Sequence, residues 1–239
     1  MAEKASQDAR DSLSVPWSDA IRFLRQLSHD LRNDLNAITL QSAYIGELEK
    51  NEELQSEIKR LRDMVSGLAS TLQRLSRDVG DVKPNLISYR ATDFMEDLRR
   101  KIEADFPKQN TEITWDIQSG NATLNVDPQL LQEVFTELFA NAFRHDRGKG
   151  PLLAKGKIDN HQFLFTLHEP KDRFDLATQN WGREPIRKIS QRHYGLGLNR
   201  VRTIIEAHGG KLLAQYDPNV SALITTVTLP VSREASEEA

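Results

Sequence analysis

Three polar residues near the start of the chain have the types and spacing needed to carry a phosphoryl group. His29, Asp30 and Asn33 stand in the segment Ser-His-Asp-Leu-Arg-Asn. Residues four apart are neighbours on a helix, so Asn33 would follow His29 by one turn, with Asp30 adjacent. Because imidazoles ionise near neutral pH, an exposed histidine keeps a nucleophilic nitrogen, and a neighbouring carboxylate can hold the other ring proton. The alternative is a surface histidine on an ordinary bundle helix.

The segment around these residues has the apolar periodicity of a helix in a coiled bundle. Heptads place apolar residues at a and d, namely Leu24, Leu31, Ile38 and Ile45 at a, and Leu27 and Leu48 at d. His29 then falls at position f, the position furthest from the partner helices. The pattern therefore predicts a helix over about residues 17–49 that displays His29 to solvent.

A second amphipathic helix is predicted after a polar turn near Asn51. Its apolar residues alternate spacings of four and three, namely Leu54, Ile58, Leu61, Val65, Leu68, Leu72, Leu75 and Val79. Gly80 and Pro84 end this helix and mark a domain boundary. Residues 17–80 would form an antiparallel hairpin that completes a four-helix bundle by pairing with a second copy, so we expect a homodimer. A long intramolecular coiled coil is the alternative.

Composition narrows the function classes. The 239 residues include 32 Lys and Arg against 35 Asp and Glu, a net charge of −3, which does not suggest a nucleic-acid surface. The absence of cysteine excludes thiol catalysis and zinc–thiolate sites. No apolar run approaches the roughly 20 residues that a transmembrane helix needs, so a cytoplasmic protein is expected. Residues 1–16 and 232–239 are expected to be polar tails.

Residues 84–231 show a different pattern, in which helices and strands are mixed. Amphipathic helices are predicted over residues 92–106, 127–144 and 196–207. Alternating strands are predicted over 86–89, 112–117, 122–126, 152–158, 162–167, 211–216 and 222–229. Strands in hairpins, interrupted by helices, favour an α/β sandwich with one sheet covered by helices. Together with the hairpin, this predicts an α+β protein.

Four motifs in this order resemble the two-component sensor histidine kinases. They are His29-Asp30-Leu31-Arg32-Asn33; Asp127-Pro128 with Glu137-Leu138-Phe139-Ala140-Asn141-Ala142; Gly195-Leu196-Gly197-Leu198; and Glu206-Ala207-His208-Gly209-Gly210. The resemblance covers about residues 20–231. It implies a dimerisation and histidine-phosphotransfer hairpin followed by a GHKL-type ATP-binding domain.

The resemblance also implies roles for individual residues of the hairpin. His29 would be the phospho-acceptor and Asp30 the acid that positions or deprotonates it. Asn33 matches a position that helps to orient water during dephosphorylation of a response regulator. The family usually has proline at the position of Asp34, and proline bends a helix by removing a backbone donor. Its absence predicts a straighter first helix.

In the second domain, the resemblance implies a nucleotide site with ATP and Mg²⁺ as cofactors. Asn141 would ligate Mg²⁺, Glu137 would lie one turn before it on the same helix face, and Arg144 would lie near the phosphates. Carboxylate and amide oxygens suit Mg²⁺ when phosphates complete its coordination. The alternative for Glu137 and Asn141 is an ordinary solvated helix face. A basic segment, comprising Trp181, Arg183, Arg187, Lys188, Arg192 and His193, could cover a nucleotide or be a solvated loop.

The chain departs from the family pattern where the base of the nucleotide would bind. The family has an Asp-x-Gly-x-Gly turn whose Asp accepts from the adenine amino group, and whose glycines let the backbone come close. Here the nearest counterpart is Glu169, followed by Pro170 and Lys171. Gly195 and Gly197 remain from a later glycine-rich loop and could open a helix toward an anion.

Two functions are compatible with these residues. The first is a histidine kinase-type protein that carries a phosphoryl group on His29 and passes it to an aspartate of a response-regulator receiver. The second is an ATP-independent dimeric histidine phosphotransferase with a degenerate ATP-binding domain. A regulatory protein that only binds a receiver is a weaker third. A separate sensor protein is a possible further partner.

Overall fold

The computed structural model describes residues 16–118, 120, 122–144, 148–174, 178, 181–182 and 196–232. Both predicted tails fall almost entirely outside these residues. So do His145, Gly195 and the basic residues of the segment 183–193. The chain divides into two compact units, Met1–Asp81 and Val82–Ala239.

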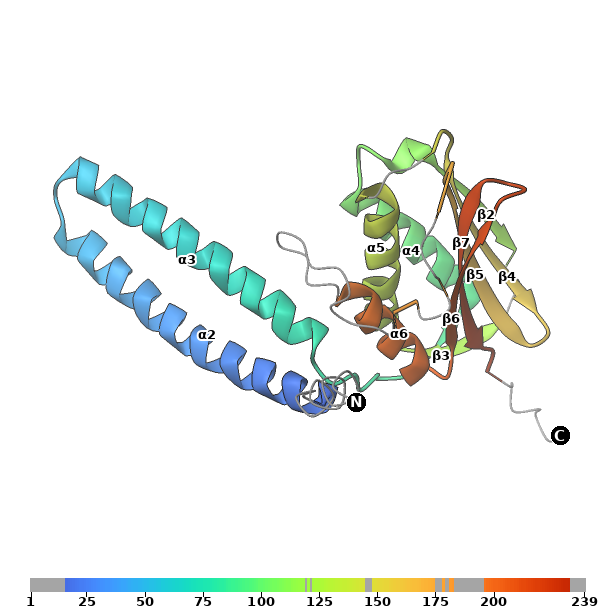
Figure 1. Ribbon diagram of the computed structural model, residues 1–239, viewed down its shortest axis with the longest axis horizontal. Helices are drawn as coiled ribbons and strands as arrows, with labels where there is room; N and C mark the ends of the chain where they lie inside the picture. Colours follow the sequence, from blue (N-terminus) through green and yellow to red (C-terminus); the bar gives the residue numbers. More distant parts are fainter. Residues whose placement is uncertain are drawn as a thin grey trace, which may run out of the picture. The chain divides into compact units, whose positions relative to one another are not determined.

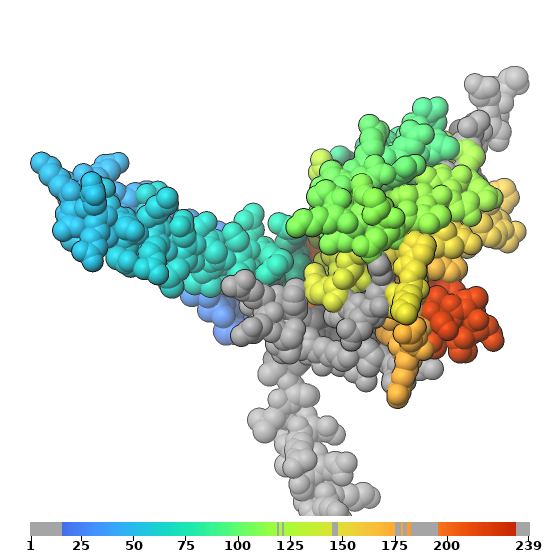
Figure 2. Space-filling model, turned by 90° about the horizontal axis from the view of Figure 1, so that it is seen from above, coloured from blue at the N-terminus to red at the C-terminus, as the bar shows by residue number. Residues whose placement is uncertain are grey.

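The first unit is an antiparallel helical hairpin of α2 (Trp17–Leu48) and α3 (Glu52–Asp78) (Figure 1). Asn51 starts α3, because its side chain accepts hydrogen bonds from the backbone N–H groups of Glu53 at 2.9 Å and Leu54 at 3.2 Å. The helix α2 runs unbroken through Asp34. In space-filling form the hairpin is a narrow rod (Figure 2), and most of its side chains are exposed to solvent.

The contact between α2 and α3 runs along one row of each helix. On α2 the buried residues are Ser28, Leu35 and Ser42, and on α3 they are Val65 and Leu72. On α2 the buried residues occupy heptad position e, the position that follows each expected d position in the sequence. Three of the four predicted a residues of α2 stay exposed, with Leu31 at 37%, Ile38 at 43% and Ile45 at 44%, while Leu24 is half-buried. A hairpin of two helices can cover only one stripe of each, so the second apolar stripe remains on the surface.

The second unit is an α/β sandwich. Its helices and turns are α4 (Ala91–Asp105), the 3₁₀ turn η1 (Asn110–Glu112), α5 (Pro128–Arg144) and α6 (Gly197–Ala207). Its strands are β1 (Ile87–Arg90), β2 (Ile113–Gln118), β3 (Thr123–Val126), β4 (Leu152–Asp159), β5 (Gln162–Pro170), β6 (Lys211–Asp217) and β7 (Ala222–Pro230). The α+β class predicted from the sequence is confirmed.

Five strands form a mixed sheet in the order β2-β4-β5-β7-β6, while β1 and β3 form a separate antiparallel pair. Within the sheet only β2 and β4 are parallel. Helices α4, α5 and α6 cover one face of the sheet (Figure 1). Phenylalanines join the layers: Phe165 of β5 lies 4.6 Å from Phe135 of α5, and Phe163 lies 6.1 Å from Phe94 of α4, between ring centroids.

Among the described residues, none of the helices combines the length and the apolar character needed to cross a bilayer.

Candidate functional site

His29 lies on the solvent-facing side of α2. Its side chain is 65% exposed and that of Asp30 is 57% exposed. The reason is local: Ser28 is buried against α3, and the next residue on a helix is turned by about 100° away from that contact. The exposure that the heptad register predicted is therefore found, although the buried row differs from the expected one.

The Nδ1 atom of His29 lies 3.2 Å from Oδ1 of Asp30 and 3.5 Å from Nδ2 of Asn33. One ring nitrogen cannot donate to the carboxylate and accept from the amide at the same time. The shorter contact and the negative charge of Asp30 favour a protonated Nδ1 that donates to Asp30. In that tautomer, Nε2 keeps its lone pair and is the nucleophilic nitrogen.

Asp30 is itself held by neighbours on α2. Its Oδ1 accepts a hydrogen bond from Nε2 of Gln26 at 2.8 Å. The hydrogen bonds from His29 and then from Gln26 lower the pKa of the Asp30 carboxyl below its ordinary value of 3.8. The carboxylate is therefore ionised at neutral pH and stabilises positive charge on the ring.

The helix end next to His29 is fixed by Arg25, which the sequence did not single out. Its guanidinium donates to the carbonyl oxygen of Val79 at 2.9 and 2.7 Å, and Nη2 lies 2.8 Å from Oδ1 of Asp81. The cation thus satisfies the carbonyl oxygen of Val79, the residue that caps the C-terminus of α3. Arg25 precedes His29 by one turn, so this contact holds the hairpin together beside the histidine.

A second cluster forms where α5 meets α6. Glu137 of α5 lies against Gly197, the first residue of α6, so closely that a Cβ atom on Gly197 would stand 2.3 Å from Oε1 of Glu137. One turn further along α5, Oδ1 of Asn141 accepts a hydrogen bond from Nη1 of Arg144 at 3.0 Å. The structure thus brings Glu137 to Gly197 and Asn141 to Arg144. The sequence prediction for Gly195 lies outside the described residues.

The geometry of this cluster suits the phosphate end of a nucleotide site. Glu137 and Asn141 are half-buried and stand one helical turn apart. Their oxygens could share a Mg²⁺ ion with phosphate oxygens, and Arg144 could balance phosphate charge. Among the described residues there is no group of three or more His, Asp or Glu side chains that could hold a metal by themselves.

The residues at the expected base-binding end do not suit adenine in the same way. Glu169 lies within β5, which continues to Pro170 because the pairing with β7 extends to Ala222. The turn of the family pattern is thus replaced here by strand. Oε1 of Glu169 lies 2.6 Å from Nζ of Lys171, and both side chains are buried. The carboxylate is already engaged by an ammonium group of the same chain.

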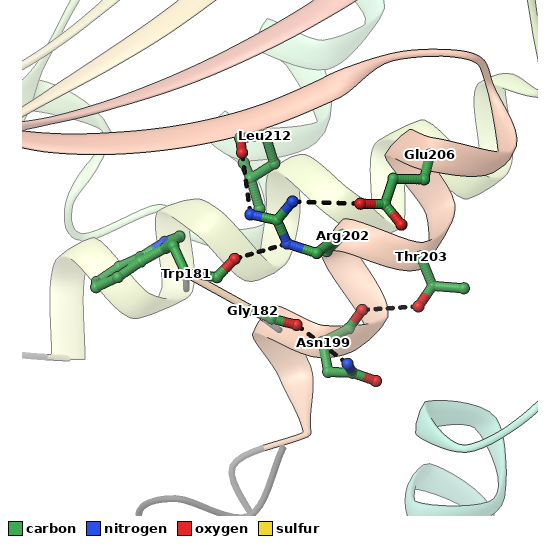
Figure 3. Close-up of polar contacts among 7 residues, drawn as sticks. All are labelled: Trp181, Gly182, Asn199, Arg202, Thr203, Glu206 and Leu212. Atoms are coloured by element: carbon green, nitrogen blue, oxygen red, sulfur yellow. Dashed lines mark hydrogen bonds and ion pairs between the residues drawn. The ribbon is translucent and has the colours of Figure 1, made fainter. Parts of the chain in front are cut away.

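Two residues in the middle of the segment between β5 and α6, Trp181 and Gly182, are hydrogen-bonded to side chains of α6 (Figure 3). Arg202 donates from Nε to the carbonyl oxygen of Trp181 at 2.7 Å and from Nη2 to that of Leu212 at 3.0 Å. Asn199 donates to the carbonyl oxygen of Gly182 at 3.0 Å. Gly182 has φ +74°, and a Cβ atom there would stand 2.4 Å from the carbonyl oxygen of Leu198. Of the residues predicted as a nucleotide cover, Trp181 is therefore anchored, and the others lie outside the described residues.

His208 is a structural histidine. Its ring is buried, Nδ1 lies 2.7 Å from the carbonyl oxygen of Ile204, and Nε2 accepts from the backbone N–H of Asp127 at 3.0 Å. This joins the end of α6 to the start of α5. Both ring nitrogens of His208 are therefore engaged in contacts within the fold.

Comparison with known proteins supports a relationship over most of the chain. No family model matches the sequence. The chain is 26% identical over 233 residues to the adaptive-response sensory kinase SasA of Prochlorococcus marinus strain MIT 9313, covering 91% of this chain and 60% of that protein. It is 25% identical over 239 residues to SasA of Synechocystis sp., covering 89% and 59%. The chain therefore spans about three-fifths of the length of the curated relatives it matches.

A solved structure agrees at the level of the fold. Full-length ShkA in complex with AMPPNP superposes with a TM-score of 0.65 at 19% identity, covering 90% of this chain and 47% of that chain. Both units of the present chain thus have counterparts in one solved protein.

Proposed function

We propose that this chain is a protein of the two-component sensor histidine kinase type, which carries a phosphoryl group on Nε2 of His29 and passes it to an aspartate of a response-regulator receiver. The observation that carries the proposal is the pairing of Nδ1 of His29 with the ionised Asp30 on an exposed helix face. That pairing leaves the other ring nitrogen both nucleophilic and accessible.

The transfer steps follow from this geometry. Nε2 attacks the phosphorus of a bound phosphoryl donor, and the bond between phosphorus and the leaving oxygen breaks. The ring becomes positively charged, and Asp30 stabilises it through the proton on Nδ1. A receiver carboxylate then attacks the phosphorus, the P–N bond breaks, and its electron pair returns to Nε2. Asn33, one turn along, is proposed to orient a water molecule when the phosphoryl group is hydrolysed.

If the protein is a histidine kinase, the second unit would bind ATP as the phosphoryl donor. Asn141 and Glu137 would hold Mg²⁺, and Arg144 and the start of α6 at Gly197 would face the phosphates. When bound, ATP would provide the γ-phosphoryl group, and Mg²⁺ would neutralise the charge of its phosphates. A phosphorylated receiver is the alternative donor, and the Glu169–Lys171 ion pair at the expected base position favours this second reading.

We also propose a homodimer built on the exposed apolar stripes of α2 and α3. On α3, Leu61 is 46% exposed and Leu68 is 51% exposed. Each helix therefore carries an exposed apolar stripe next to its buried row, as Leu31 and Ile38 do on α2. Two copies of the hairpin would cover these stripes as a four-helix bundle. The receiver would then dock on the outer face that carries His29.

The test uses the purified chain, the His29→Gln variant and a His161→Gln control, whose histidine lies in the exposed β4–β5 turn. Each is incubated with radiolabelled ATP and Mg²⁺, and separately with labelled phosphorylated receiver domains. Acid-labile label on wild type and on the control, and none on His29→Gln, is expected. Label from ATP identifies the kinase, whereas label from a receiver alone identifies the phosphotransferase. Undiminished label on His29→Gln, or no label on wild type from either donor, would contradict the proposal.

A further inference from the structure

The pair Glu169–Lys171 is the most deeply buried ion pair among the described contacts of the second unit. The two side chains are 10% and 7% exposed, and Nζ lies 2.6 Å from Oε1. Phe163, Phe165 and Leu167 alternate along β5 with the same phase as Glu169, and they face the helices. Glu169 therefore projects from the sheet into the helix-covered side, where a ligand bound between sheet and helices would meet it.

The backbone around Lys171 is fixed on several sides. Its N–H donates to the carbonyl oxygen of Ser221 at 2.8 Å, and its own carbonyl oxygen accepts from the hydroxyl of Tyr216 at 3.1 Å. The carbonyl oxygen of the preceding Pro170 accepts from the N–H of Gly148 at 2.8 Å. These bonds fix the origin of the lysine side chain, so its inward direction is built into the fold.

We propose that Lys171 is an internal competitor for the purine amino group at Glu169. An adenine ring would offer the carboxylate one N–H donor, but the ammonium of Lys171 already stands beside that oxygen, with Nζ 2.6 Å from Oε1. Binding of adenine would require this ion pair to open and would leave a buried ammonium without its partner. Lys171 thereby removes the preference for adenine nucleotides from a domain that keeps its phosphate-end residues.

The consequence is a specific pattern of nucleotide selectivity. With Lys171 in place, the adenine of ATP forms no hydrogen bond with Glu169, so this position does not favour the binding of ATP over GTP. Without the ammonium, the carboxylate accepts from the amino group of adenine, whereas guanine presents a carbonyl oxygen at the equivalent ring position and is repelled. This inference concerns the second unit alone and does not depend on the chemistry of His29.

Isothermal titration calorimetry with the full chain tests the proposal, with MgATP and MgGTP as separate ligands. Lys171→Met is expected to bind MgATP at least about tenfold more tightly than wild type, the factor that one charge-assisted hydrogen bond supplies. MgGTP affinity is expected not to increase, because the unpaired carboxylate repels the carbonyl oxygen of guanine. The matched control is Lys157→Met, because Lys157 forms an exposed ion pair with Asp159 at the same sequence spacing.

The double variant Glu169→Leu with Lys171→Met removes both charges and is expected to lose the gain in MgATP affinity. Replacing a buried ion pair by apolar residues is usually tolerated, and circular dichroism confirms that each variant is folded. A folded Lys171→Met variant with unchanged MgATP affinity, or with an equal gain for MgGTP, overturns the proposal. If that variant does not fold, wild type decides: a tenfold preference for MgATP over MgGTP overturns the proposal, and no preference supports it.

Discussion

Glu137 of α5 and Gly197 of α6 touch at the junction of their helices, and a Cβ atom on the glycine would stand 2.9 Å from Cδ of the glutamate. The contact joins two residues that the sequence places far apart, and it lies at the proposed phosphate end of the second unit. It also makes the position of the Glu137 carboxylate depend on the lack of a side chain at residue 197.

The first prediction is that Gly197→Ala and Glu137→Ala are energetically coupled. The new methyl group displaces the flexible end of Glu137, while alanine favours the helix by about 1 kcal/mol over glycine. The single variant Gly197→Ala should therefore change stability by less than about 1 kcal/mol. A double-mutant cycle from urea unfolding should give a coupling of about 0.5–3 kcal/mol. Additive effects would show that the two residues do not touch; Glu57→Ala on α3 is the uncoupled control.

The second prediction concerns the exposed apolar stripe of the hairpin. Leu68→Glu places a charge in the stripe that a second copy would cover, so it should convert a dimer into monomers in sedimentation equilibrium. Leu40→Glu is the control, because Leu40 is 72% exposed but lies on the opposite side of α2 from the stripe. Equal dissociation by both substitutions, or by neither, would rule out this surface as the dimer contact.

The third prediction is that His208 stabilises the second unit by joining two helices. His208→Ala leaves the N–H of Asp127 without its acceptor and opens a cavity, which should cost about 1–3 kcal/mol in the free energy of unfolding. His161→Gln, in an exposed turn, should cost less than about 0.5 kcal/mol. A small loss at His208 in guanidinium unfolding would show that the hydrogen bond is not formed.

The fourth prediction is a pH dependence that originates at His168 of β5. Burial, and then the ammonium of Lys155, lower the pKa of His168 below its ordinary value of 6.5. The unfolded chain therefore binds a proton more readily than the folded chain, and stability falls as pH drops below 6.5 toward the pKa of the folded state. His168→Gln should remove this dependence.

The measurement is the difference in unfolding free energy between wild type and His168→Gln from pH 8 to pH 5. The difference should be constant above about pH 7 and shift against wild type below it. Lys155→Gln should weaken the shift, because it removes the cation that opposes protonation. A difference that stays constant over the whole range would refute the assignment.

Local patterns were enough to predict most of the elements. The helix predicted over residues 17–49 is α2 (Trp17–Leu48), and the strand predicted over 211–216 is β6 (Lys211–Asp217). Period and capping are properties of neighbouring residues, so they can be read without knowing the partner of an element. The strand β5 was underestimated, because its last residues are held by pairing with β7, a segment far along the chain.

By itself, the sequence determined that His29 stands on an amphipathic helix with Asp30 beside it, because helical geometry alone makes them neighbours. The tertiary structure decided which stripe of α2 is buried: the row through Leu35 packs on α3, and the row through Ile38 stays exposed. Only the fold also shows that Glu169 pairs with Lys171 and that Gly197 meets Glu137. A periodic pattern states that a face is apolar or polar, but the contacts of a buried group depend on segments that chain folding brings together.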